Sequence, residues 1–148
     1  MKKIIKGILI DSVTEVIKEI EIEVKRDCCF DALCKHLNCD GVEHVALDEE
    51  TETNLLYVDS VGLLKPQEKY LKIKDHAAFL PPRAIVIGYN EELDSYKDHS
   101  LDINDFKNLI MFLSVNEAKA LAKMIDQQNS QWADHPMIFC QKLSDLFN

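Results

Sequence analysis

Residues 16–24 place the strictest limit on the fold, because apolar and charged side chains alternate there. The segment reads Val-Ile-Lys-Glu-Ile-Glu-Ile-Glu-Val, so Ile20, Ile22 and Val24 share one face and the glutamates share the other. A period of two predicts a β-strand, since successive side chains of a strand point to opposite faces. One apolar face and one acidic face are typical of an antiparallel sheet that is open to water on one side.

Four more segments are predicted to be strands. Residues 3–10 are rich in β-branched side chains, and residues 42–47 and 55–59 flank a polar loop, which predicts a hairpin. Residues 83–89 form the most continuous β-type run, which predicts a central strand buried on both faces. Residues 65–82 show no regular pattern and are predicted to be irregular.

A short amphipathic helix is predicted over residues 28–37, with Asp27 as its N-cap and with Gly41 taking a positive φ after its end. Its apolar residues recur at helical spacing: Phe30, Leu33, Cys34 and Leu37. Ser114 and Glu117 fit a capping box, which predicts that a second helix begins there. A third helix is predicted from Asp134, and residues 101–113 suit a short helix or a helix followed by a strand.

The predicted fold is therefore α+β. We expect an antiparallel or mixed sheet of about five strands, one helix inserted between the second and third strands, and C-terminal helices packed on or beside the sheet. The 148 residues are enough for a single domain with its own core. A sub-boundary is possible in the acidic segment 91–100, which is predicted to be a loop or linker before the helical C-terminal third.

Composition excludes several function classes. A net charge of −9 repels nucleic-acid phosphates and anionic membranes, and the longest late apolar run, residues 109–113, is too short to span a bilayer. Four glycines cannot make a P-loop or a dinucleotide fingerprint, so no cofactor is expected. An odd number of cysteines, five, favours reduced thiols in the cytoplasm.

Cysteine and histidine residues form two candidate sites. Cys34, His36 and Cys39 could ligate zinc, but their spacing fits no finger pattern, and thiols that fill the core are favoured instead. Cys140 with His135 near a helix start could form a nucleophile and base, although a chance spacing is the favoured explanation.

Two acidic clusters could bind a basic partner. The first is predicted to be a partner-binding loop and contains Asp48, Glu49, Glu50 and Glu52; the second contains Glu91, Glu92, Asp94 and Asp98. Calcium is disfavoured because no EF-hand spacing is present. Solvated loops are the alternative for each cluster taken alone.

Four polar side chains lie on or beside the predicted hairpin and central strand: Tyr57, Asp59, Arg83 and Tyr89. If the strands are neighbours, these side chains could converge on a small-ligand pocket at the end of the sheet. In the favoured alternative, Asp59 makes the turn and Arg83 pairs with a nearby carboxylate.

Residues 55–64, together with the Arg-Ala-Ile-Val-Ile-Gly run at 83–88, resemble a family of small uncharacterised proteins of bacteria, plasmids and phages. The resemblance covers residues 4–113. It implies a setting in mobile elements and assigns no activity and no site residue.

The expected function is a non-enzymatic binding or protein-interaction module, with an accessory role in a mobile element as one setting. The alternatives are an acidic inhibitor that occupies the basic groove of a nucleic-acid enzyme and a small enzyme that uses a Cys/His pair. The expected partner is a protein of unknown identity. The C-terminal helices could also pair two copies of the chain into a homodimer.

Overall fold

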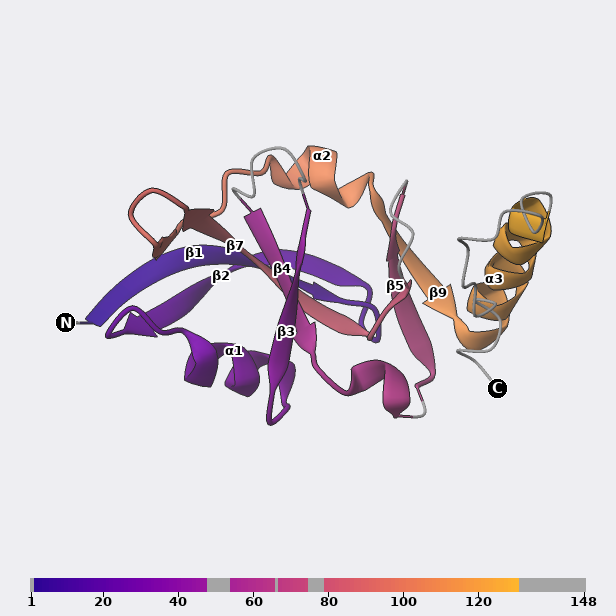
Figure 1. Cartoon of the computed structure of the whole chain (residues 1–148), viewed down its shortest axis with the longest axis horizontal. Helices are drawn as coiled ribbons and strands as arrows, with labels where there is room; N and C mark the ends of the chain where they lie inside the picture. The colour runs from indigo at the N-terminus through magenta and orange to yellow at the C-terminus, as the bar shows by residue number, and fades with distance from the viewer. Residues whose placement is uncertain (1, 48–53, 66, 75–78, 131–148) are drawn as a thin grey trace.

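The computed structural model describes residues 2–47, 54–65, 67–74 and 79–130 (Figure 1). Its main feature is a six-stranded antiparallel sheet, here sheet A. Five strands follow one another across it: β2 (Val16–Lys25), β1 (Lys2–Asp11), β7 (Arg83–Asn90), β4 (Asn54–Asp59) and β3 (Val42–Ala46). The sixth, β8 (Ser95–Lys97), pairs with the far end of β7, where β1 no longer does.

A second, three-stranded sheet, sheet B, has the order β6 (Phe79–Leu80), β5 (Lys69–Ile73) and β9 (Ile110–Ser114). The prediction that residues 65–82 are irregular is therefore wrong for residues 69–73 and 79–80. A 3₁₀ turn, η1 (Gly62–Leu64), precedes these strands. Residues 101–113 resolve into a helix, α2 (Ile103–Lys107), and then β9, as one of the two predicted arrangements has it.

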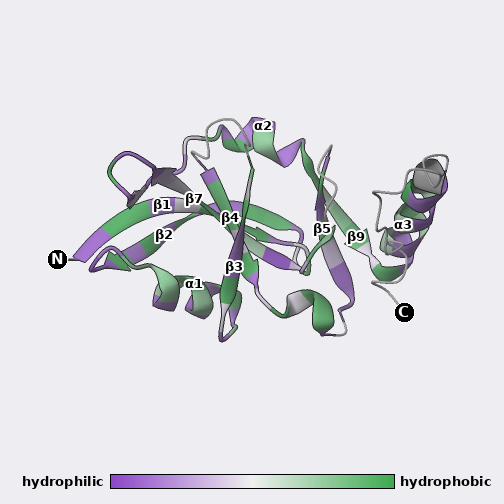
Figure 2. Cartoon of the chain, viewed as in Figure 1, coloured by the Kyte–Doolittle hydropathy of each residue, from purple (hydrophilic) through white to green (hydrophobic). Residues whose placement is uncertain are grey.

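The two faces of sheet A are covered by different elements, with α1 (Phe30–Leu37) on one side and α2 on the other (Figure 1). Ile85 and Ile87 of β7 pack with the α1 face, while Ala84 and Val86 pack with residues of α2 and β5. These four side chains have no exposed surface. The prediction of a central strand buried on both faces is confirmed, and Figure 2 shows the hydrophobic residues along the middle of β1 beside it.

The alternation on β2 is also confirmed. Ile22 and Val24 are buried, while Glu21 on the opposite face is exposed. Because β2 is an edge strand of sheet A, its outer face carries charges that discourage another chain from pairing with it.

The ends of α1 differ from the prediction. Cys29, not Asp27, stands at the N-cap position and makes no side-chain capping bond. Asn38, not Gly41, takes the left-handed conformation after the last turn, with φ of 53°, and no glycine has a positive φ in the described part of the chain. Asparagine tolerates this conformation because its short polar side chain bonds locally. Phe30 is 44% exposed, so it does not belong to the buried stripe.

The capping box at the start of α3 (Val115–Ser130) is confirmed. The Ser114 hydroxyl accepts from the Glu117 N–H at 3.2 Å, and the Glu117 carboxylate accepts from the Ser114 N–H at 3.2 Å. Ala118 and Ala122 then pack against Tyr70 and other residues of sheet B. The helix predicted from Asp134 lies outside the described residues.

The acidic segment 91–100 contains β8, so its interpretation as a loop or linker is wrong for residues 95–97. Gly88 permits the arrangement, because a Cβ there would overlap the carbonyl oxygen of Asp98. The structure as a whole has the predicted α+β class, with the helix inserted between the second and third strands. Within the described ranges, no helix combines the length and apolar character that a bilayer crossing requires.

Candidate binding pocket

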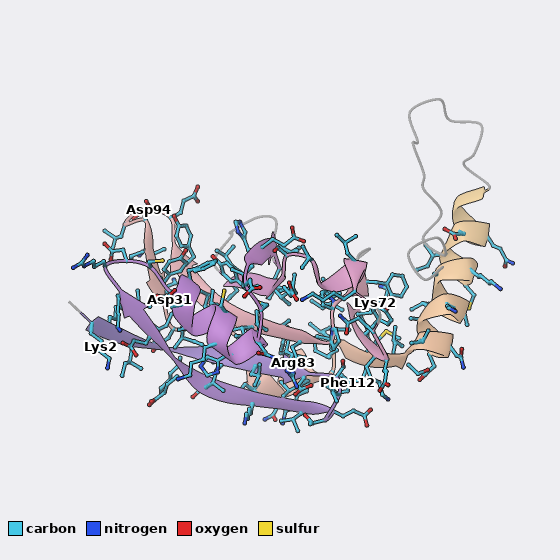
Figure 3. The ribbon with its side chains drawn as sticks, turned by 90° about the horizontal axis from the view of Figure 1, so that it is seen from below. Lys2, Asp31, Lys72, Arg83, Asp94 and Phe112 are labelled. Carbon is cyan, nitrogen blue, oxygen red and sulfur yellow. The ribbon has the colours of Figure 1, made fainter. Side chains whose placement is uncertain are left out.

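The four residues predicted to converge at the sheet end divide between two cavities. β4 and β7 pair antiparallel with Tyr57 opposite Ile85, so Asp59 and Arg83 lie at one end of the strand pair and Tyr89 lies at the other. Figure 3 shows α1 lying between Arg83 and Asp94, which marks the second end.

At the first end, a cavity of about 260 Å³ is lined by Asp59, Lys65 and Arg83 among others. The Asp59 carboxylate accepts from Val61 N–H at 3.0 Å and from Lys65 Nζ at 2.7 Å, while Arg83 Nε lies 3.3 Å from the Asp11 carboxylate. Burial acts to raise the pKa of Asp59, but the hydrogen bonds from Lys65 and Val61 together lower it. The charged groups of this cavity are therefore paired. This agrees with the alternative explanation from the sequence, in which Asp59 makes a turn and Arg83 pairs with a nearby carboxylate.

At the second end, a cavity of about 370 Å³ collects aromatic and acidic side chains. We call it the tyrosine pocket. Its lining residues come from the turn before α1, from the turn between β7 and β8, and from four strands of sheet A: Asp27, His44, Leu55, Tyr57, Tyr89, Asp94 and Tyr96. Tyr57 and Leu55 are buried, while Asp27, His44 and Asp94 are exposed and leave the cavity accessible.

Strand register brings the rings together. His44 lies opposite Tyr57 across the β3–β4 pair, and Tyr89 lies opposite Tyr96 across the β7–β8 pair. The ring centroids are 5.5 Å apart in the first pair and 5.8 Å apart in the second, with interplanar angles of 51° and 58°. Tilted pairs at this distance are a favoured aromatic geometry, and direct cross-strand neighbours are the pairs that stabilise a sheet.

Contacts between hydroxyl groups link the pocket, and the pKa values of two of its phenols, Tyr57 and Tyr89, are raised. The Tyr57 and Tyr96 oxygens lie 3.4 Å apart, and burial, followed by the contact with Tyr96, raises the pKa of Tyr57 far above its usual value. The Tyr89 hydroxyl donates to the Asp94 carboxylate, which raises the pKa of Tyr89 to about 12. Tyr57 and Tyr89 therefore carry no negative charge at neutral pH.

Two of the described thiols, Cys29 and Cys39, have raised pKa values. Burial, with a smaller contribution from Cys28, raises the pKa of Cys29 to about 11, and burial followed by Cys34 raises the pKa of Cys39 to about 11. A thiol with such a pKa is protonated at neutral pH and is a poor nucleophile.

The weak zinc candidates do not form one site. Cys34 and His36 are two residues apart on α1, a spacing that turns side chains to different sides of a helix. His36 instead lines a separate cavity of about 540 Å³ with Cys28 and side chains of both charge signs. Over the described residues, no group of three or more His, Cys, Asp or Glu side chains could hold a metal ion. The Cys140–His135 candidate lies outside the described residues.

Only the second acidic cluster belongs to the part of the chain that the structure describes, because Asp48, Glu49, Glu50 and Glu52 lie outside it. In the second cluster, Asp98 accepts from the Lys6 N–H at 2.8 Å and Asp94 accepts from Tyr89, so these two acids hold strands and turns together. Glu91 and Glu92 are exposed.

Sequence reasoning missed Asp27, His44 and Tyr96 as parts of a site. The signal that could have found Tyr96 is the Tyr-Asn-(four residues)-Ser-Tyr pattern at 89–96, which places two tyrosines opposite each other once a hairpin is assumed. His44 could be found only by aligning the β3–β4 hairpin on its register.

Comparisons with family models, with curated proteins and with solved structures give no match to this chain. The resemblance of residues 55–64 and 83–88 to a family of plasmid and phage proteins stays a prediction.

Proposed function

We propose that the protein is a non-enzymatic binding module that takes its ligand in the tyrosine pocket. The observation that carries the proposal is the convergence of three tyrosines and one histidine from four strands on a single accessible cavity. Small-ligand sites are concave, mostly apolar or aromatic, and carry a few polar groups that fix orientation.

The neighbouring chemistry supports binding over catalysis. The buried thiol nearest the pocket, Cys29, has a pKa of about 11, so it is protonated under the conditions in which a cysteine nucleophile must be a thiolate. The phenol of Tyr89 is likewise held neutral by Asp94. Each of these groups lacks the pKa near neutrality that acid–base or nucleophilic work favours.

Partner and setting are part of the same proposal. The ligand belongs to a partner protein or is a small molecule, and a homodimer through the C-terminal helices and an accessory role in a mobile element are kept as further hypotheses. Sedimentation analysis of the full chain tests the dimer, since a monomer at micromolar concentration contradicts it.

A fragment screen tests the binding function. Two-dimensional amide NMR spectra of the full chain are recorded with a library of neutral and charged fragments, and shifts are expected to gather on residues that line the tyrosine pocket. Fragments that perturb only the Asp59–Arg83 cavity, or none that perturb the protein at all, contradict the proposal. Consumption of a fragment during the experiment would instead favour the enzyme alternative.

A further inference from the structure

We infer that the tyrosine pocket binds an organic cation, meaning an ammonium or guanidinium group on a short alkyl chain. The inference rests on the proposed function, because it names the ligand class of the same pocket. Three observations carry it: the aromatic walls, the two carboxylates with no cationic partner among the described residues, and the size of the cavity.

The walls suit a cation because the faces of aromatic rings carry partial negative charge. Tyr57, Tyr89 and Tyr96 line the cavity together with His44, and the rings are tilted within each pair so that they are not stacked flat. A cation within about 6 Å of such a ring is attracted to its face. Leu55 adds an apolar surface against which an alkyl chain can pack.

The carboxylates supply negative charge that no ion pair within the described part of the protein neutralises, and Asp94 accepts only from the Tyr89 hydroxyl among the described hydrogen bonds. Asp27 follows β2 and Asp94 lies in the turn between β7 and β8, and both line the pocket. Throughout the described ranges, no lysine or arginine lies within ion-pair distance of either one. The Asp59–Arg83 cavity at the other end of α1 shows the opposite arrangement, because Asp59 pairs with Lys65 and Asp11 pairs with Arg83.

The cavity has room for a small organic head group. About 370 Å³ is near the lower end of the range of small-ligand pockets, which fits one ammonium or guanidinium group with a few methylene groups. A free metabolite and the side chain of a basic partner protein both present this chemistry, and the experiment separates them.

The test uses two cations and their uncharged isosteres on the full chain at constant ionic strength. Choline is compared with 3,3-dimethyl-1-butanol, in which carbon replaces the nitrogen, and Nα-acetyl-lysine amide is compared with the amide of Nα-acetyl-2-aminoheptanoic acid, in which a methyl group replaces the ammonium group. Amide NMR titration locates each site and gives each dissociation constant. We expect each cation that enters the pocket to bind at least about fivefold more tightly than its isostere. Tighter binding of choline indicates a free metabolite, and tighter binding of the lysine derivative indicates a protein side chain.

Matched variants separate this pocket from the general attraction of an acidic protein for cations. Asp94→Asn keeps the shape and removes the charge, so it should weaken cation binding several-fold and leave the isosteres unaffected. Asp59→Asn makes the same change at the other cavity and should alter neither. His44→Ala, at an exposed position, should weaken cation binding by removing one wall.

The outcomes distinguish the two proposals. Equal binding of cations and isosteres in the pocket overturns the inference and leaves the binding function standing. Neutral fragments that bind there while no cation binds lead to the same conclusion. A cation site that responds to Asp59→Asn and not to Asp94→Asn also overturns the inference, and an absence of binding by every probe and every fragment overturns both proposals.

Discussion

The hydroxyl oxygens of Tyr57 and Tyr96 lie 3.4 Å apart, joining β4 to β8 although β7 separates these strands in the sheet. The contact links the two ring pairs of the tyrosine pocket. Tyr96 also packs against the core cluster that contains Cys29, which brings the turn before α1 to the same group of side chains.

Removing either hydroxyl should therefore reveal a coupling between them. Tyr57→Phe and Tyr96→Phe are each expected to lower the free energy of unfolding by about 0.5–1.5 kcal/mol, because each removes one partner of the contact between the two hydroxyl groups. The double variant should lose less than the sum. Urea denaturation of all four proteins measures the cycle, and losses that add to within about 0.3 kcal/mol would show that the hydroxyls are independent.

Tyr89 should lose its proton at a higher pH than an ordinary tyrosine does. Its hydrogen bond to Asp94 favours the neutral phenol, so its folded pKa of about 12 exceeds the unfolded value of about 10. The resulting stabilisation is complete below about pH 10 and is lost as the pH rises through the folded value. Ultraviolet titration of tyrosinate should show one group shifting downward in Asp94→Asn, and the same group should be missing in Tyr89→Phe.

Alkylation should distinguish the two adjacent cysteines. Cys28 is exposed, whereas Cys29 is buried and its pKa of about 11 leaves roughly one thiolate in a thousand at pH 8. We expect iodoacetamide to modify Cys28 first, as measured by peptide mass spectrometry of native protein. In urea both should react readily. Equal rates in the native protein would contradict the burial of Cys29.

Gly88→Ala should destabilise the protein more than Gly41→Ala. At Gly88 the added methyl group meets the backbone carbonyl of Asp98, which can move only with the strand, and overpacking of this kind costs about 1–3 kcal/mol. At Gly41 the nearest atom is the Ser60 side-chain oxygen, which can rotate away. Urea midpoints at unchanged denaturant slope measure both changes. A similar midpoint for the two variants would argue against close approach at Gly88.

Ser114→Ala should weaken the start of α3. The serine hydroxyl is the acceptor for the Glu117 N–H, and loss of an N-cap side chain costs about 0.5–2 kcal/mol. Ser114→Thr retains the acceptor and should recover most of the difference. Circular dichroism during thermal unfolding gives the comparison, and equal stability of the alanine and threonine variants would exclude a role for the cap.

The strands that sequence could predict are those whose side chains obey a simple rule. β2 alternates because one face is wet, and β7 is continuously apolar because both faces are covered. The capping box could be predicted because both partners lie within four residues.

The elements that escaped prediction depend on distant partners. Lys72 of β5 is buried although it is charged, with an exposed fraction of 7%. Because a charged residue stands at a buried position, the sequence of β5 shows neither alternation nor a continuous apolar run. β8 has only three residues in an acidic segment, and it forms because Gly88 lets the chain after β8 approach β7. Local propensity does not report such tertiary effects.

Only part of the candidate site could be predicted from the sequence, because its other residues also depend on tertiary structure. Tyr57 and Tyr89 lie on strands that the pattern identifies, but which of their neighbours share a cavity depends on register. The strand register places Asp59 and Arg83 at the opposite end of the β4–β7 pair. It also places His44 opposite Tyr57 and Tyr96 opposite Tyr89. A shift by one residue would turn every side chain to the other face, so strand existence alone could not define the pocket.

The central place of β7 governs the order in which the polypeptide can acquire structure during synthesis. Residue 8 pairs with residue 86, and the last partner of β7 ends at Lys97. Until residues 83–90 have been synthesised, the β1–β2 hairpin has no β7 to cover its inner edge. Pairings this distant along the chain form slowly, so the inner edge of β1 stays unpaired until β7 is complete.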